Sequence, residues 1–137
     1  MTDPRLDPWD VTLFDTHSWL WAVSAPENLS ETAQRAWDRA AERAISAMSC
    51  WEVAVKAASG KLGLKAPIRP WMMEAINQPR FKVLPLSPEI ATRSAELKAA
   101  LRDPADCVIA ASALVYGMPL VTKDARMQRL LGLNWIW

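Results

Sequence analysis

Cysteine and histidine are scarce in this sequence, and their scarcity argues against several kinds of site. The 137 residues contain two cysteines, Cys50 and Cys107, and one histidine, His17. The cysteines lack metal-ligand spacing and the disulfide-framework composition of a small secreted domain, so a reducing cytoplasm fits this chain best. One histidine alone is poor support for zinc or for a charge-relay triad. We therefore expect His17 to have a structural role.

An excess of charge of either sign is also absent. Lys and Arg total 16 against 15 for Asp and Glu, so the formal net charge is +1. Nucleic-acid binding would then need a local basic patch or a metal ion. Residues 1–10 contain two prolines, three aspartates and no apolar run, which excludes a signal peptide or membrane span there. We expect residues 1–10 to be a flexible leader, and no membrane partner.

Apolar residues, by contrast, are plentiful, at 51% of the chain with eight tryptophans. This content and length predict one globular domain over residues 11–137. Short apolar runs alternate with helical patterns, which predicts an α/β fold with a central, mainly parallel sheet of four to five strands. Strands are expected over 11–14, 44–48, 81–84, 120–122 and 134–137, and helices over 16–23, 31–43, 49–59, 71–77, 88–101, 105–116 and 125–131.

Four acidic residues follow predicted strands or begin predicted helices. Asp15 and Asp124 follow the first and fourth strands, Glu52 lies in the first turn after the second strand, and Asp106 begins an apolar helix. In an open sheet that grows first on one side and then on the other, the first and fourth strands are neighbours. The carboxylates can then border one crevice, where an all-oxygen ligand set favours Mg²⁺ or Mn²⁺ over zinc. Such ions activate water for phosphodiester hydrolysis.

Each acid also has a structural interpretation. The acids that follow strands can cap helices. Ser49 and Glu52 match a capping box, in which the glutamate reaches back to the N–H of the cap. Lys56 follows Glu52 at i+4 and can pair with it. Asp106 has the weakest structural explanation, because Asp103 already caps its helix and an unpaired buried carboxylate is costly.

Three further residues near these acids have open roles. Thr122 is a hydroxyl beside the last acid and can hydrogen-bond a carboxylate. Trp19 and Trp21 follow the first acid closely and can stack on nucleobases. Aromatic residues on a short helix more often serve the core or an interface. Both alternatives remain open for the two tryptophans.

Four segments carry the acids in a characteristic order: LFDTHSWLW at 13–21, SCWEVAVK at 49–56, DPAD at 103–106 and PLVTKD at 119–124. They resemble the PIN domain family and, within it, the VapC-type ribonuclease toxins of bacterial toxin–antitoxin pairs. The resemblance implies a three-layer fold and an endoribonuclease that depends on Mg²⁺ or Mn²⁺. It further implies an RNA substrate, a cognate antitoxin and a homodimer.

In this resemblance the metal ligands and catalytic residues match Asp15, Glu52, Asp106 and Asp124, with Thr122 and Asp103 in support. Two departures stand out. Cys107 replaces an arginine that often follows the third acid, and the ten-residue leader precedes the usual start. Neither departure removes a ligand.

Two other functions fit part of this pattern. A noncatalytic receiver module also uses acids, a threonine and a lysine around Mg²⁺. It is disfavoured because Lys123 is followed by Asp124 instead of proline and one acid lies in a helix. An inactive PIN scaffold kept for binding is disfavoured by the intact set of four acids.

Overall fold

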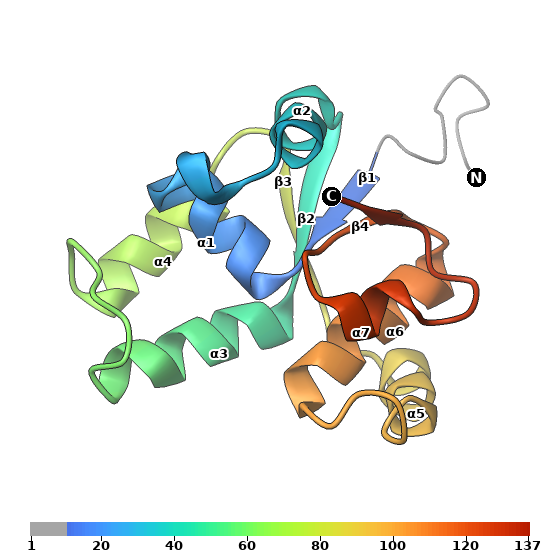
Figure 1. Ribbon diagram of the computed structural model, residues 1–137. Coiled ribbons are helices and arrows are strands. Elements are labelled where there is room, and N and C mark those ends of the chain that lie inside the picture. Colours follow the sequence, from blue (N-terminus) through green and yellow to red (C-terminus); the bar gives the residue numbers. More distant parts are fainter. Residues whose placement is uncertain (1–10) are drawn as a thin grey trace.

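Five parallel strands form the centre of the computed structural model, which describes residues 11–137 (Figure 1). The strands are β1 (Val11–Phe14), β2 (Glu42–Ser46), β3 (Phe81–Leu84), β4 (Leu120–Val121) and β5 (Trp135–Ile136). Their order is β3-β2-β1-β4-β5, and every neighbouring pair is parallel. The predicted fold class is confirmed, as is the pairing of the first strand with the fourth. The leader predicted over residues 1–10 lies outside the described residues.

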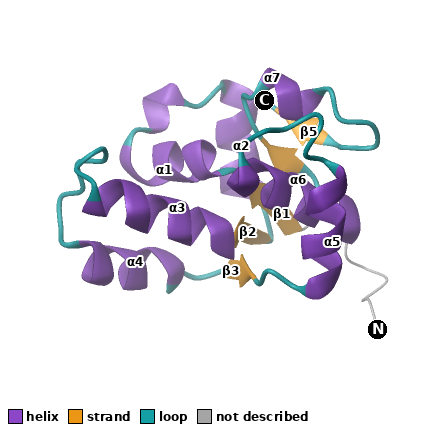
Figure 2. Cartoon of the chain, turned by 90° about the horizontal axis from the view of Figure 1, so that it is seen from below, coloured by secondary structure: helices purple, strands orange, loops and turns teal. Residues whose placement is uncertain are grey.

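Helices cover both faces of this sheet (Figure 2). They are α1 (Thr16–Ser24), α2 (Glu31–Arg39), α3 (Ala47–Ala58), α4 (Ile68–Ile76), α5 (Pro88–Glu96), α6 (Pro104–Tyr116) and α7 (Ala125–Gln128), with a 3₁₀ turn, η1 (Pro26–Asn28), after α1. Helices α1 to α4 pack on one face, and α5 and α6 pack on the other. Among residues 11–137, no helix is long and apolar enough to cross a membrane.

Alternation along the strands divides the core into two parts. Successive strand residues point to opposite faces of a sheet. Leu13 and Ala44 join the core under α5 and α6, while Phe14 and Ile45 join the core under α1 to α4. These four residues of the central strands are fully buried, as expected where a parallel sheet is covered on two sides. Trp19 is the largest fully buried side chain of the α1 side.

Most of the predicted helix caps are present. In each case a side-chain oxygen accepts a hydrogen bond from a backbone N–H in the first turn, which satisfies a group that the helix leaves unpaired. Five caps of this kind are Asp15, Asp103 and Asp124, which the sequence predicts, together with Ser30 and Ser87. Three of these five caps are acids of interest, so the local backbone fixes their positions.

The boundary between β2 and α3 differs from the prediction. β2 starts at Glu42 because its backbone pairs with β1 from that residue onward, which ends α2 at Arg39 instead of near residue 43. Ser46 caps α3 and accepts a hydrogen bond from the Met48 N–H at 3.0 Å. Ser49 therefore lies inside the helix, and the predicted capping box with Glu52 is wrong.

Other helix ends also move by a few residues. α4 begins at Ile68, before the predicted start at residue 71, and α7 ends at Gln128, before the predicted end at residue 131. α5 ends at Glu96, although the pattern predicted a helix to residue 101. Leu97 is its C-cap, and Leu97 and Leu101 are both buried in the core that includes α6. None of these shifts moves an acid of interest out of place.

Candidate functional site

A cavity of about 430 Å³ lies where the carboxyl ends of β1 and β4 meet. This is the place where ligands bind in open α/β sheets whose strand order changes direction. Carboxylates from β1, α3, α6 and β4 or their flanks line one part of it. We call this set the acidic wall: Asp15, Glu52, Asp103, Asp106 and Asp124.

Asp15 is the most deeply placed acid of the wall. It follows β1, caps α1 and is 6% exposed, and its Oδ1 accepts a hydrogen bond from the Ser18 N–H at 2.9 Å. Burial raises the pKa of Asp15 above its ordinary value, while hydrogen bonds from Ser18 and Thr122 oppose that rise. A buried carboxylate of this kind gains stability when a cation or further donor approaches it.

Glu52 reaches the cavity from the second turn of α3. Its Oε1 accepts a hydrogen bond from the Thr16 hydroxyl at 2.7 Å, and its Oε2 lies 3.2 Å from the Lys56 Nζ. The predicted Glu52–Lys56 pair is therefore confirmed. Thr16 and Lys56 hold the carboxylate from two sides, so Glu52 is oriented by side chains and not by a helix cap.

Asp106 is partly buried and is repelled by the other four acids of the wall. Its pKa is raised to about 7, mainly by burial, and then by the negative charges of Asp103, Glu52, Asp124 and Asp15. Asp103 caps α6 by accepting a hydrogen bond from the Asp106 N–H at 3.1 Å, so the two acids are neighbours. Of the four acids, Asp106 had the weakest structural explanation in the sequence. Its raised pKa agrees with that expectation, because the fold disfavours its charged form.

Asp124 lies where the chain leaves β4. Its Oδ1 caps the short α7 by accepting a hydrogen bond from the Arg126 N–H at 2.8 Å. The Asp124 N–H donates to the Thr122 Oγ1 at 3.1 Å. Thr122 is fully buried. Because it hydrogen-bonds Asp15 as well as Asp124, it links the acids that follow β1 and β4. This placement agrees with a supporting role for the Thr122 hydroxyl.

The donor set fits a hard divalent cation more closely than any other common group. Among residues 11–137, no three His, Cys, Asp or Glu side chains form a ready metal cage. Mg²⁺ commonly uses only one or two protein carboxylates and keeps several waters, so a loose acidic cluster suits it. Burial and, after it, the neighbouring negative charges raise the pKa of Asp106, and a bound cation would oppose both effects.

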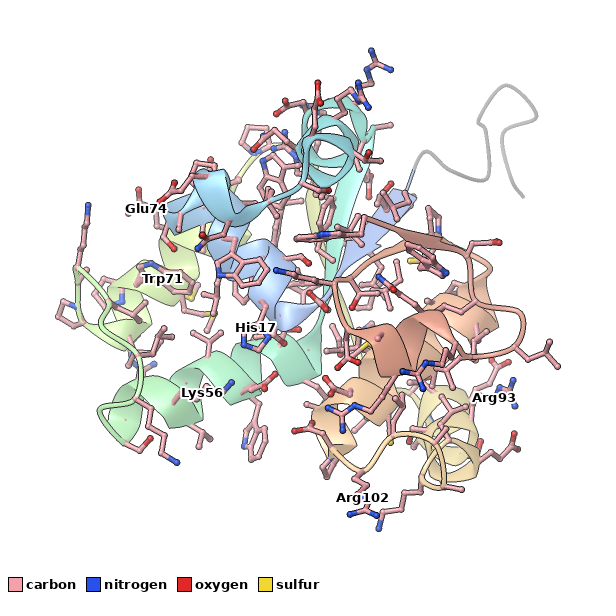
Figure 3. The ribbon with its side chains drawn as sticks, in the orientation of Figure 1. His17, Lys56, Trp71, Glu74, Arg93 and Arg102 are labelled. Carbon is pink, nitrogen blue, oxygen red and sulfur yellow. The ribbon has the colours of Figure 1, made fainter. Side chains whose placement is uncertain are left out.

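The other part of the cavity is aromatic and basic. We call His17, Trp21 and Lys123 the aromatic–basic wall, because all three line the same cavity as the acids. His17 lies 5.8 Å from Trp21 between ring centroids, and the Lys123 Nζ lies 5.9 Å from the Trp21 ring. Figure 3 places His17 near Lys56, where α1 passes α3.

Several of these placements differ from what the sequence suggested. His17 is exposed in the cavity and lies outside the core, and the structural role expected for it stays a prediction. Trp19 is buried against Trp71 and Phe81, which excludes base stacking by that residue. Lys123 was not predicted at the site; its position directly before a candidate acid was the available signal.

Comparison with known proteins finds similarity over most of the chain. A PIN domain family model matches residues 12–132. The sequence is 32% identical over 119 residues to Ribonuclease VapC22 of Mycobacterium tuberculosis (strain ATCC 25618 / H37Rv), which covers 86% of this chain and 90% of that protein.

Solved structures of low sequence identity share the fold. VapBC2 from Rickettsia felis, bound to a DNA fragment from its promoter, matches with a TM-score of 0.68 and 17% identity, covering 91% of this chain and 96% of that chain. DNA-bound VapBC from Salmonella typhimurium matches with a TM-score of 0.66 and 20% identity, covering 90% and 95%. At these identities the likeness concerns the fold alone.

Proposed function

This chain belongs to the PIN domain family, and from that premise we propose that it is an endoribonuclease that depends on Mg²⁺ or Mn²⁺ and acts as the toxin of a toxin–antitoxin pair. The single observation that carries the proposal is the meeting of Asp15, Glu52, Asp106 and Asp124 in one cavity. The name of the 32% identical relative, a ribonuclease, supports RNA as the substrate. An RNA substrate and two free cysteines fit a cytoplasmic location.

In this proposal the four acids hold the cation and the surrounding hydroxyls hold the acids. A bound Mg²⁺ or Mn²⁺ would supply a Lewis acid that activates water and neutralises charge on the scissile phosphate. Ser18 and Thr122 keep Asp15 in place by hydrogen bonds, and Thr16 fixes one oxygen of Glu52. Hydrogen bonds from neighbouring side chains orient metal ligands in this way in other proteins.

Charge in the cavity also favours a phosphodiester once a cation is present. Five carboxylates face three cationic side chains, so the empty cavity would repel RNA. Two of the cations are already paired, Lys56 with Glu52 and Arg126 with Asp124. Cation binding is therefore expected to precede or accompany substrate binding.

Replacement of Asp15 tests the proposal directly. We expect Asp15→Asn to lower the rate of RNA cleavage in Mg²⁺ or Mn²⁺ by at least about 100-fold. Loss of a residue that only hydrogen-bonds a metal ligand typically costs about 10- to 100-fold in metal affinity or activity, and loss of a ligand should cost more. Cleavage is measured on total RNA and on synthetic oligoribonucleotides, with and without EDTA. Asp38→Asn on the exposed surface of α2 is the matched control. Undiminished cleavage by Asp15→Asn would contradict the assignment as a metal-dependent endoribonuclease.

An antitoxin partner and a homodimer belong to the same proposal. The structural neighbours named above are VapBC assemblies, which supports a protein partner for this chain. Co-expression with the candidate antitoxin should suppress cleavage and yield a complex that survives size-exclusion chromatography. Light scattering of the isolated chain checks the dimer.

The two alternative functions have different standing. The alternative that this chain is a receiver module is wrong, because the PIN domain family model matches residues 12–132. An inactive PIN scaffold is distinguished by titration of Mn²⁺ into the protein, followed by calorimetry. We expect binding that the Asp15→Asn variant weakens, whereas an inactive scaffold would bind no Mn²⁺.

A further inference from the structure

Trp21 lies in the cavity without a core role that would explain its position. It is half-buried, and its ring lies 5.8 Å from His17 and 5.9 Å from Trp137 between centroids. Trp19, two residues earlier, is fully buried and packs against Trp71 on the other side of α1. The helix thus uses one tryptophan for the core and presents the second to the cavity.

The side chains around Trp21 suit an anionic ligand that carries an aromatic ring. The Lys123 Nζ lies 5.9 Å from the Trp21 ring, and Lys123 forms no salt bridge with any residue in 11–137. His17 beside it is exposed. A nucleotide offers both a ring for stacking on tryptophan and a phosphate for a lysine. The cavity volume of about 430 Å³ lies in the range of small-ligand sites.

We propose that Trp21 is a base-stacking residue that holds the nucleobase next to the scissile phosphate, with Lys123 on the adjoining phosphate. This inference rests on the proposed ribonuclease function and adds a substrate-positioning subsite to it. The acidic wall and the aromatic–basic wall share one cavity, so one dinucleotide step of RNA can contact both. Stacking on an aromatic ring tolerates any base but favours bases that stack strongly.

RNA binding in a cleavage-deficient background tests this subsite. Each variant is made together with Asp15→Asn, and binding of fluorescein-labelled oligoadenylate and oligouridylate is followed by fluorescence anisotropy. Trp21→Ala should weaken binding about fivefold to 100-fold, because base–aromatic stacking has that effect in single-strand binding proteins. Trp21→Phe should retain most of the affinity, and the loss should be larger for oligoadenylate. Trp135→Ala, an exposed tryptophan on β5, is the control and should bind normally.

Two further measurements connect the effect to stacking and charge. The first uses a series of oligonucleotides, each with one abasic residue at a different position. One member of the series should bind the protein with Trp21 less tightly than the others, whereas Trp21→Ala should bind all members equally well. Lys123→Met should reduce the slope of log affinity against log salt by about one, as expected for one lost phosphate contact. Thermal unfolding of each variant verifies that it is folded.

The outcomes separate this inference from the proposed function. Equal RNA binding by Trp21→Ala and Trp135→Ala, with no abasic position that distinguishes Trp21, would overturn the subsite. A wild-type protein that never cleaves RNA, while the Asp15→Asn protein still binds RNA through Trp21, would support the subsite and contradict the nuclease. Loss of antitoxin binding in Trp21→Ala with RNA binding unchanged would reassign the aromatic–basic wall to the protein partner.

Discussion

The acidic wall and the aromatic–basic wall face the same cavity, but different forces hold them in place. Asp15, Asp103 and Asp124 each cap a helix through a backbone N–H, so main-chain geometry sets their positions. Trp21 is held by ring contacts with His17 and Trp137 at 5.8 and 5.9 Å. The acids are therefore preorganised by the fold, whereas the aromatic–basic wall depends on how α1 and its side chains pack.

The two walls need different degrees of support for their chemistry. Carboxylates that repel one another stay together only if something other than their own contacts fixes them. Helix caps provide that support at three acids, and the Thr16 hydroxyl and Lys56 provide it at Glu52. An aromatic residue that stacks on a flexible substrate needs no comparable precision. Substitutions that affect packing, charge and a single ion pair test this contrast in decreasing order of effect.

The largest effect on stability is expected from the tryptophan that seats α1. Trp19→Ala removes a fully buried ring that packs against Trp71 and Phe81, and we expect the free energy of unfolding to fall by about 3–5 kcal/mol. Trp21→Ala on the same helix is the control and should cost about 1 kcal/mol. Urea denaturation measures both. Equal losses would show that the two tryptophans do not divide core and cavity roles.

A smaller effect of opposite sign is expected at Asp106. Its pKa is raised from 3.8 to about 7 in the folded protein, so the folded state binds a proton more tightly than the unfolded state does. The stabilisation from this proton is complete below about pH 4 and is lost as the pH rises through 7. Asp106→Asn should therefore stabilise the metal-free protein near pH 8 by about 1–2 kcal/mol, after allowance for solvent screening of a partly exposed group.

Two conditions make this prediction specific. Near pH 4 the same substitution should have little effect on stability, because both side chains are then uncharged. Added Mn²⁺ should stabilise the wild type and not the variant, since the ionised carboxylate is what the cation would bind. Thermal unfolding at the two pH values, with EDTA or Mn²⁺, checks both. A variant that is less stable than the wild type near pH 8 would contradict the repulsion inferred for this cavity.

The smallest effect is expected at the ion pair beside Glu52. Lys56→Ala breaks a helical i,i+4 pair and should lower the free energy of unfolding by about 0.5 kcal/mol or less. Arg93→Ala removes a comparable exposed helical pair with Glu96 on α5 and is the control. Chemical denaturation of both proteins measures the difference. A clearly larger loss for Lys56→Ala would mean that the lysine also relieves repulsion within the acidic wall.

Local chemistry made much of this architecture predictable. The Asp103–Pro104 cap and the apolar run after it located α6, and β1 and β3 were found at their observed bounds. The acids at the ends of β1 and β4 could be placed together because the strand order follows from chain direction in an open sheet. Signals of this kind act over a few residues or through a general topological rule.

Features set by long-range contacts could not be predicted in the same way. Glu42 and Arg43 are charged, yet pairing with β1 and β3 draws them into a strand. Ser46 and Ser49 are both suitable caps, and only the end of β2 decides between them. His17 lies in the cavity because of how α1 packs in the fold, which no local pattern indicates.

The pairing of β1 with β4 also bears on when the cavity can form during synthesis. Leu13 lies opposite Leu120 and Phe14 opposite Val121, so partners in the sheet are made more than a hundred residues apart. Contacts of such long range form slowly, because closing a long loop costs entropy before the contact stabilises the chain. Asp15 is synthesised more than a hundred residues before Thr122 and Asp124, which are its neighbours in the cavity. A nascent chain therefore cannot assemble the cavity until synthesis has passed residue 124.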